Sequence, residues 1–471
     1  MRKRRRLNKL LNASAVLYSA ILFFICTCNH FSMAQQSKNL SDKTYKAGIL
    51  QKIYGLLESK YVLPEMANKY AEEFKKNYTL GSYDSCTDAK EFSAKVTADL
   101  IGITKDKHIN FRRIESSDIG EKPESSLHHP IRYHRLAIKE NAGFSRLEWL
   151  EGNIGYLDIR RFNSFSDTKD RVVAAMRFLS NADAIIIDLR ENGGGSGDYL
   201  SSYFLKYPTQ LTGCYSREDD FLTESWTSKE IGMEPLTDVP LFLLTSRRTF
   251  SASESFAYDM KVRKRATLVG DSTKGGAHSV DLYKIDDQFE IYISTARAIN
   301  PITFGNWEGT GVVPDIVVPS ASALDTAIVL ARKAGGTFAG AKEAKLKLAV
   351  KEMQIHMDRA ELLFRDGKTA VAGAALDSVF QIADQFNLTN EFFIDVLAYN
   401  YLSPEDERIL YAILKKKIEF FPKSFTAYET LAYAYFKNNK KESAIKNYKK
   451  VLELDPDNRN AMTMIKRLQN K

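Results

Sequence analysis

The chain has 471 residues, of which 44% are hydrophobic and 27% are charged, a composition that excludes a disordered or fibrous protein. Its length exceeds that of a typical domain and predicts about three folding units. The formal net charge is +8, but the first 34 residues carry six basic and no acidic side chains, which leaves +2 for the rest, so nothing here favours nucleic-acid binding.

Residues 1–34 have the three parts of a secretory signal: a basic stretch at 2–9, an apolar run at 16–26 and a small-residue cleavage site at 32–34. The apolar run is shorter than the roughly 20 residues that a membrane span needs. We therefore expect cleavage, export to the periplasm or the extracellular space, and no stable membrane span in the mature chain. Lipid anchoring at Cys28 fits less well, because a threonine precedes it.

From residue 43 to about 105, apolar side chains recur at helical spacing, which predicts a small helical domain over 43–114. Residues 115–130 are polar and interrupted by proline, which predicts a loop or flap.

The segment 131–335 alternates short apolar runs with helical patterns. The apolar runs begin at Gly155, Ala184, Leu241 and Thr267, and the helical patterns lie near 167–180 and 252–264. Continuous apolar strands separated by helices predict an α/β core whose strands are covered on both faces.

Residues 345–471 carry a helical repeat with a period of about 34 residues. The matching positions are Tyr428, Leu431, Ala432, Tyr435, Ala444, Tyr448 and Pro456. This pattern is typical of the tetratricopeptide repeat, in which small residues stand where two helices approach closely. The repeats have two open interpretations: a cap that stabilises the core, or a groove that binds a partner protein or peptide.

Of the four cysteines, Cys86 and Cys214 remain after signal cleavage, and their spacing does not decide whether they pair. Neither Cys-x-x-Cys nor His-Glu-x-x-His occurs, so we expect no metal and no cofactor.

Two motifs offer chemistry. Ser251 follows an apolar strand and opens an amphipathic helix, where nearby backbone N–H groups favour an oxyanion, although Ser251 and Glu254 also match a helix-capping box. Earlier, three consecutive glycines at 193–195 follow a buried strand and allow close approach of the backbone to a substrate. The glycines match neither a dinucleotide fingerprint nor a phosphate loop.

Four ordered motifs together resemble a known family. They are Asp188-Leu-Arg-x-Asn-x-Gly-Gly, Ser251-Ala-Ser-Glu, Gly270-Asp-Ser-Thr and Gly311-Val-Val-Pro-Asp. The chain is similar over about 45–335 to the tail-specific (C-terminal processing) peptidases, tricorn protease and the interphotoreceptor retinoid-binding protein. The resemblance implies a crotonase-like α/β core, a serine endopeptidase without a cofactor, and Ser251 as its nucleophile.

The general base is the point on which members of this family differ. The lysine of the tail-specific peptidases corresponds to Gly276 here, and Lys274, two residues away, is an alternative. Tricorn-type members use histidine and glutamate, which resemblance places at His108 as base and Glu308 as the group that orients it. The serine before that histidine in tricorn protease is Lys107 here, which leaves open whether activity is altered.

The resemblance also implies an oxyanion hole made by the backbone N–H groups of Gly194, with Gly195 as its neighbour, and of Ala252. His278, in a glycine-rich loop, is the second candidate base. The predicted function is therefore a peptidase that acts on peptides or proteins. The alternative is a non-catalytic protein that binds an apolar ligand or peptide in the same cleft, and a third hypothesis makes the repeats the working part.

Overall fold

The computed structural model describes residues 39–114, 128–195 and 199–470. The predicted signal at 1–34 and most of the predicted flap at 115–130 lie outside these residues. The chain divides into two compact units, one ending at Gly336 and one beginning at Thr337. Among the described helices, none combines the length and apolar character that a membrane crossing requires.

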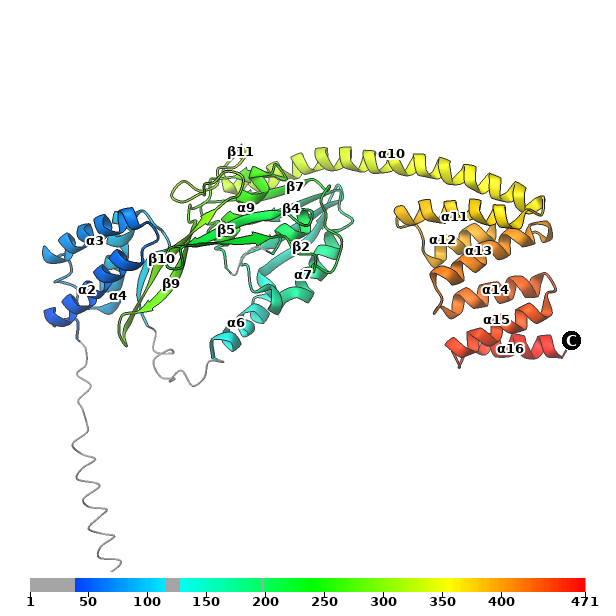
Figure 1. Ribbon diagram of the computed structural model, residues 1–471, viewed down its shortest axis with the longest axis horizontal. Helices are drawn as coiled ribbons and strands as arrows, with labels where there is room; N and C mark the ends of the chain where they lie inside the picture. Colours follow the sequence, from blue (N-terminus) through cyan, green and yellow to red (C-terminus); the bar gives the residue numbers. More distant parts are fainter. Residues whose placement is uncertain (1–38, 115–127, 196–198, 471) are drawn as a thin grey trace, which may run out of the picture. The chain divides into compact units, whose positions relative to one another are not determined.

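Three helices open the first unit: α2 (Lys43–Lys60), α3 (Pro64–Thr79) and α4 (Ala89–Thr104) (Figure 1). Asp42 and Asp88 cap α2 and α4, because their carboxylates accept hydrogen bonds from the free N–H groups of the first turn. The helices enclose an apolar core of their own, in which Phe92 meets Phe289 edge to face at 5.8 Å between ring centroids. Phe289 belongs to a strand of the α/β core, so the helical part is packed onto that core.

The α/β core contains a six-stranded sheet in the order β11-β8-β7-β4-β3-β2. Its strands are β2 (Phe144–Leu150), β3 (Ile154–Ile159), β4 (Ala184–Asp188), β7 (Leu241–Thr245), β8 (Ala266–Gly270) and β11 (Ile316–Val317). All neighbours pair in parallel except β2 with β3. Every residue of β4 and β7 is buried, which confirms the predicted α/β class with strands covered on both faces.

The helix α6 (His128–Lys139) precedes the first of these strands. Between the strands lie α7 (Phe165–Leu179), the short α8 (Ser201–Phe204) and α9 (Ala252–Val262). Short 3-10 turns lie at Asn141–Gly143 and Ser320–Ser322. The first turns of α10 (Ala323–Arg365) place three fully buried alanines against β3, β4, β7 and β8, because small side chains let the helix lie close to the sheet.

A second, antiparallel sheet was not predicted. It contains β1 (Asn110–Arg113), β5 (Gln210–Ser216), β6 (Phe221–Trp226), β9 (His278–Lys284) and β10 (Phe289–Ile299). The order is β1-β10-β5-β6, and β9 also pairs with β10. The strand β6 is exposed throughout, so its sequence lacks the apolar signal of a buried strand.

The second unit is entirely helical over its described residues. It holds the end of α10 followed by α11 (Thr369–Gln385), α12 (Glu391–Tyr399), α13 (Glu407–Phe420), α14 (Phe425–Lys437), α15 (Lys441–Leu454) and α16 (Arg459–Gln469), with a 3-10 turn at Pro404–Asp406. The pair α14 and α15 carries the predicted repeat, and Ala432, Ala444 and Tyr448 are fully buried between its helices. Residues 335–345 lie between two neighbouring domains that the sequence predicts. In the structure they belong to α10, which is continuous through them.

The first prediction concerns Lys46, which is buried in the N-terminal helices. Its ammonium group donates to the backbone carbonyls of Tyr83, Asp84 and Cys86 at 3.1, 2.8 and 3.1 Å. We expect Lys46→Met to lower the local free energy of unfolding by about 2–4 kcal/mol, because buried carbonyls lose their donor. Native-state hydrogen exchange of the α2 amides measures this.

The matched control is Lys43→Met on the same helix. The Lys43 side chain is 78% exposed and pairs with Asp84, so solvent screens the pair and we expect its loss to cost far less than the loss of Lys46. Equal effects of the two substitutions would show that the three buried hydrogen bonds do not stabilise this part.

Candidate active site

Ser251 stands at a sharp turn between a strand and a helix. The strand β7 ends at Thr245, and α9 begins at Ala252, directly after Ser251. The backbone of Ser251 has φ 58° and ψ −122°, a left-handed conformation that is uncommon for a residue other than glycine. A strained turn of this kind is typical of a serine nucleophile, because it presents the hydroxyl group away from the sheet.

The carboxylate of Glu254 holds this turn in place. It accepts hydrogen bonds from the backbone N–H of Ser251 at 2.8 Å, of Gly275 at 2.6 Å and of Gly276 at 2.9 Å. The hydroxyl group of Thr273 donates to the same carboxylate. Burial raises the pKa of Glu254, and these four donors oppose that shift. The residue is thus more than the helix cap its spacing predicted, since it joins the Ser251 turn to the loop before β9.

A pocket opens beside Ser251 between β5, α9 and the start of β9. Small side chains and glycines form much of its wall, and Trp307 and His278 complete it. Cys214 of β5 also lines the pocket and lies 3.5 Å from the hydroxyl of Ser279. Cys214 and the buried Cys86 are both free, so the structure does not pair them.

The glycine run at 193–195 lies against the Ser251 turn. A Cβ atom on Gly194 would stand 2.8 Å from Cβ of Ser251, so only glycine permits this approach. The N–H of Gly194 donates to the side-chain oxygen of Asn192 at 2.8 Å, which differs from its predicted place in an oxyanion hole. Within the described residues, the backbone N–H groups of Gly195 and Ala252 have no hydrogen-bond partner.

His108 is the histidine beside the serine turn. Its ring lies against that of Phe250, tilted by 30° with 4.3 Å between centroids, and neither ring nitrogen has a hydrogen-bond partner among the described residues. A Cβ atom on Gly276 would stand 2.6 Å from Cε1 of His108. The ring therefore occupies the space beside position 276, where resemblance places a lysine in the tail-specific peptidases. Burial lowers the pKa of His108 to about 4, although the charge of Asp106 acts in the opposite direction.

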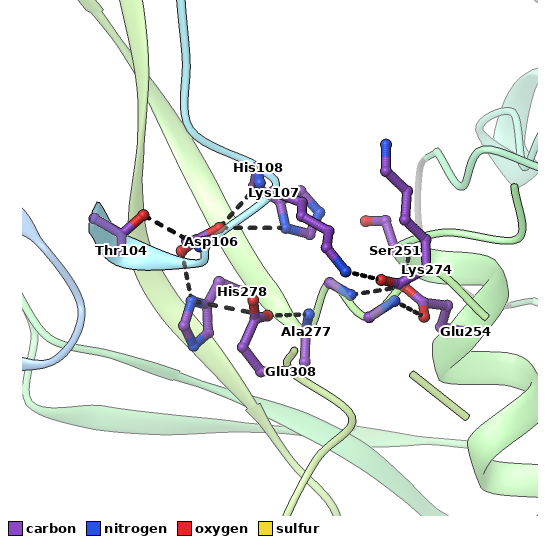
Figure 2. A network of polar contacts seen from close by, with 12 residues as sticks. Thr104, Asp106, Lys107, His108, Ser251, Glu254, Lys274, Ala277, His278 and Glu308 are labelled. Atoms are coloured by element: carbon purple, nitrogen blue, oxygen red, sulfur yellow. Dashed lines mark hydrogen bonds and ion pairs between the residues drawn. The ribbon is translucent and has the colours of Figure 1, made fainter. Parts of the chain in front are cut away.

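Asp106 links the two histidines (Figure 2). Its Oδ2 atom accepts from Nδ1 of His278 at 2.7 Å, and its Oδ1 atom accepts from the backbone N–H of His108 at 2.9 Å. The Oδ1 atom also lies 4.0 Å from Nδ1 of the His108 ring. Sequence reasoning missed Asp106 as a site residue, although it lies only two positions before His108.

Glu308 lies beside His278 and not in contact with His108, which differs from the predicted pairing. One carboxylate oxygen accepts from the backbone N–H of Ala277 at 2.5 Å and lies 3.9 Å from Nδ1 of His278. The other oxygen is buried without a hydrogen-bond partner in the described part of the chain. Burial raises the pKa of Glu308, and the charge of His278 opposes that shift.

The same cluster has the residue types of a metal site. Single ligand atoms of Asp106, His278 and Glu308 lie within 4.8 Å of one another. Because the three residues come from distant segments, no local spacing in the sequence could indicate such a group.

The two lysines near the site interact with the loop before β9. The ammonium group of Lys274 lies over the ring of Phe250, 4.4 Å from its centroid. The side chain of Lys107 donates to the backbone carbonyl of Lys274. Lys107 therefore ties the His108 segment to that loop, and it stands where tricorn protease has a serine.

Comparisons with known proteins extend these observations. A sequence model described as peptidase family S41 matches residues 153–318, and one described as the N-terminal domain of peptidase S41 in eukaryotic IRBP matches residues 33–147. A tetratricopeptide repeat model matches residues 426–458.

Curated relatives include carboxyl-terminal-processing proteases of two cyanobacteria. The protein of Picosynechococcus sp. is 28% identical over 205 residues, 42% of this chain and 47% of the relative. That of Synechocystis sp. is 30% identical over 171 residues, 35% of this chain and 38% of the relative. The chain thus spans less than half the length of either. A solved photosystem II D1 C-terminal processing protease gives a TM-score of 0.36 at 15% identity, covering 58% of this chain and 92% of that one.

The second prediction concerns Glu254, which is fully buried. We expect Glu254→Gln to lower the free energy of unfolding by about 2–4 kcal/mol, because an amide has one acceptor oxygen for four donors and brings its N–H₂ group against backbone N–H groups. Urea unfolding followed by hydrogen exchange of the α9 amides measures the change.

Glu65→Gln serves as the control, since Glu65 is an exposed acidic residue in the first turn of α3. We expect it to change stability by less than about 0.5 kcal/mol. A Glu254→Gln protein as stable as this control would mean that the four hydrogen bonds do not hold the turn.

Proposed function

Because the chain belongs to peptidase family S41, we propose that it hydrolyses peptide bonds with Ser251 as the nucleophile. The observation that carries this proposal is the strained turn of Ser251, with the glycine run against it and a pocket beside it. In this proposal the backbone N–H groups of Gly195 and Ala252, which have no hydrogen-bond partner within the described residues, stabilise the tetrahedral oxyanion.

The proposed mechanism uses His108 as general base. Oγ of Ser251 attacks the peptide carbonyl while His108 takes the hydroxyl proton, and His108 then gives that proton to the leaving amine. Water attacks the acyl-enzyme with the same base, which releases the acid and restores Ser251. The contact of the His108 ring with Phe250, the residue before the serine, supports this choice. Lys274 is the weaker candidate, because its ammonium lies over the face of the Phe250 ring.

We extend the proposal to location and partners. The signal pattern of residues 1–34 supports export to the periplasm or extracellular space. The substrate is a peptide or protein that reaches the pocket beside Ser251, and the repeats are proposed to bind a partner protein.

The third prediction tests the nucleophile and the base. We expect a fluorophosphonate probe to label the mature chain from Gln35, and we expect Ser251→Ala and His108→Ala to lose both labelling and casein cleavage, by about 10³-fold or more in kcat. Labelling is read by gel fluorescence and cleavage by peptide release.

Ser255→Ala is the matched control, because Ser255 lines the same pocket on α9. It should keep its label. A folded wild-type protein that neither labels nor cleaves would contradict the peptidase proposal and favour a protein that binds a ligand or peptide in this cleft.

The fourth prediction concerns pH. A general base acts only when unprotonated, so kcat/KM falls as the pH drops below its pKa. Because burial lowers the pKa of His108 to about 4, we expect activity to persist well below pH 6.5. The measurement is kcat/KM against pH with a substrate that has no ionisable group. On the acidic limb of this profile kcat/KM falls with decreasing pH. A limb centred near pH 7 would show that His108 is solvated or is not the base.

A further inference from the structure

We propose that Asp106 and His278 are positioning residues for His108: a buried His278 imidazolium keeps the Asp106 carboxylate ionised and fixed, and that carboxylate, in place of Glu308, stabilises the charge that His108 gains. The inference rests on the proposed role of His108 as base. It gives Asp106 and His278 roles of their own, in addition to those of the proposed nucleophile Ser251 and the proposed base His108.

The geometry of Asp106 supports the first step. Only 1% of its side chain is exposed, and three donors fix its carboxylate: Nδ1 of His278 at 2.7 Å, the backbone N–H of His108 at 2.9 Å and the hydroxyl of Tyr61 at 3.2 Å. The backbone of Asp106 is fixed as well, because its N–H donates to the hydroxyl of Thr104 at 3.1 Å. A carboxylate held in this way cannot turn away from the ring 4.0 Å from it.

The charge balance supports the second step. Two carboxylates, that of the buried Asp106 and that of the partly buried Glu308, lie beside a single buried imidazole, that of His278. Leaving both uncompensated in a buried place is costly, so a cation between them is favoured. Burial alone would lower the pKa of His278, but the hydrogen bond and charge of Asp106, with Glu308, raise it above its ordinary value.

The other groups that face the two rings act less strongly. Arg297 of β10 lowers the pKa of His278, and the ring of Tyr61 meets its imidazole edge to face at 6.3 Å. The charges of His278 and Lys274 lower the pKa of His108, while Asp106 raises it. Asp106 is thus the group that favours the protonated form of His108, which is the form that arises during the reaction.

A hydrogen-bonded cluster describes these side chains better than a metal site. The 2.7 Å between Nδ1 of His278 and Oδ2 of Asp106 is a hydrogen-bond distance. Two ligands of one tetrahedral zinc ion would stand roughly 3.3 Å apart or more. The carboxylates of Asp106 and Glu308 already accept from Tyr61 and from the backbone of Ala277.

The first arm of the test requires no activity. In full-length mature protein carrying Ser251→Ala and ¹⁵N-labelled histidine, we expect His278 to be an imidazolium at pH 7 and His108 to be neutral. His278→Gln and His108→Ala assign the two signals, and His134→Gln identifies an exposed histidine that pairs with Asp167 at 3.0 Å and serves as the reference. A neutral His278 at pH 7, or one equivalent of metal lost with His278→Gln, would overturn the proposal whether or not the protein is a peptidase.

The second arm measures peptide hydrolysis by Asp106→Asn, His278→Gln and the double variant. We expect Asp106→Asn to reduce kcat about 10²–10⁴-fold with KM almost unchanged, and to move the acidic limb of kcat/KM to lower pH, because His108 loses the charge that favours its protonated form. The double variant should be no slower than Asp106→Asn, because His278 acts through Asp106.

The control for activity is His134→Gln, which makes the same substitution in an exposed pair and should leave kcat unchanged. Additive losses in the double variant, or an unshifted acidic limb in Asp106→Asn, would indicate a merely structural cluster. The opposite result would show that Glu308 orients His108. In that case Glu308→Gln would lower kcat and shift the acidic limb of the kcat/KM profile, and Asp106→Asn would do neither.

Discussion

The buried carboxylate of Glu254 is the interaction on which the site depends. It is the shared acceptor for the Ser251 turn and for the loop at 273–276, two segments that the chain supplies more than twenty residues apart. Through the hydroxyl of Thr273 the connection continues to the N–H of Val312, which donates to that hydroxyl at 2.7 Å. The buried carboxylate of Glu254 thus holds together the segments that carry three of the four sequence motifs. In the structure these three motifs form one hydrogen-bonded unit.

A second constraint positions His108, the proposed base, near this unit. His108 follows α4 after a residue in the left-handed conformation, Lys105, which ends the helix and reverses the chain. The core of the N-terminal helices includes Phe289 and Ile291 of β10, so the segment after α4 is held against the same strand that pairs with β9. Because β9 begins at His278, the packing of the helices onto the core also sets the distance between the two histidines.

The sequence predicted those features that have a local signal. Continuous apolar runs predicted β3, β4, β7 and β8, and the periodicity around Tyr448 predicted the helix pair of the repeat, because burial on both faces and helix contact each impose a residue pattern. The strand β6 and the cluster around Asp106 have no such pattern, since an exposed strand needs no apolar run and the cluster joins distant segments. Resemblance proposed Ser251, His108 and Glu308 from the order of the motifs, and their catalytic roles stay predictions. The partner of Glu308 depends on side-chain placement, which motif order does not contain.

The missing side chain of Gly276 has an evolutionary consequence. A Cβ atom at 276 would stand 2.2 Å from the ring of Phe250 and 2.6 Å from Cε1 of His108, so any larger residue there requires a neighbouring ring to move. A substitution at 276 is therefore expected together with a change at 108 or 250, which couples the residue type at 276 to the placement of the proposed base.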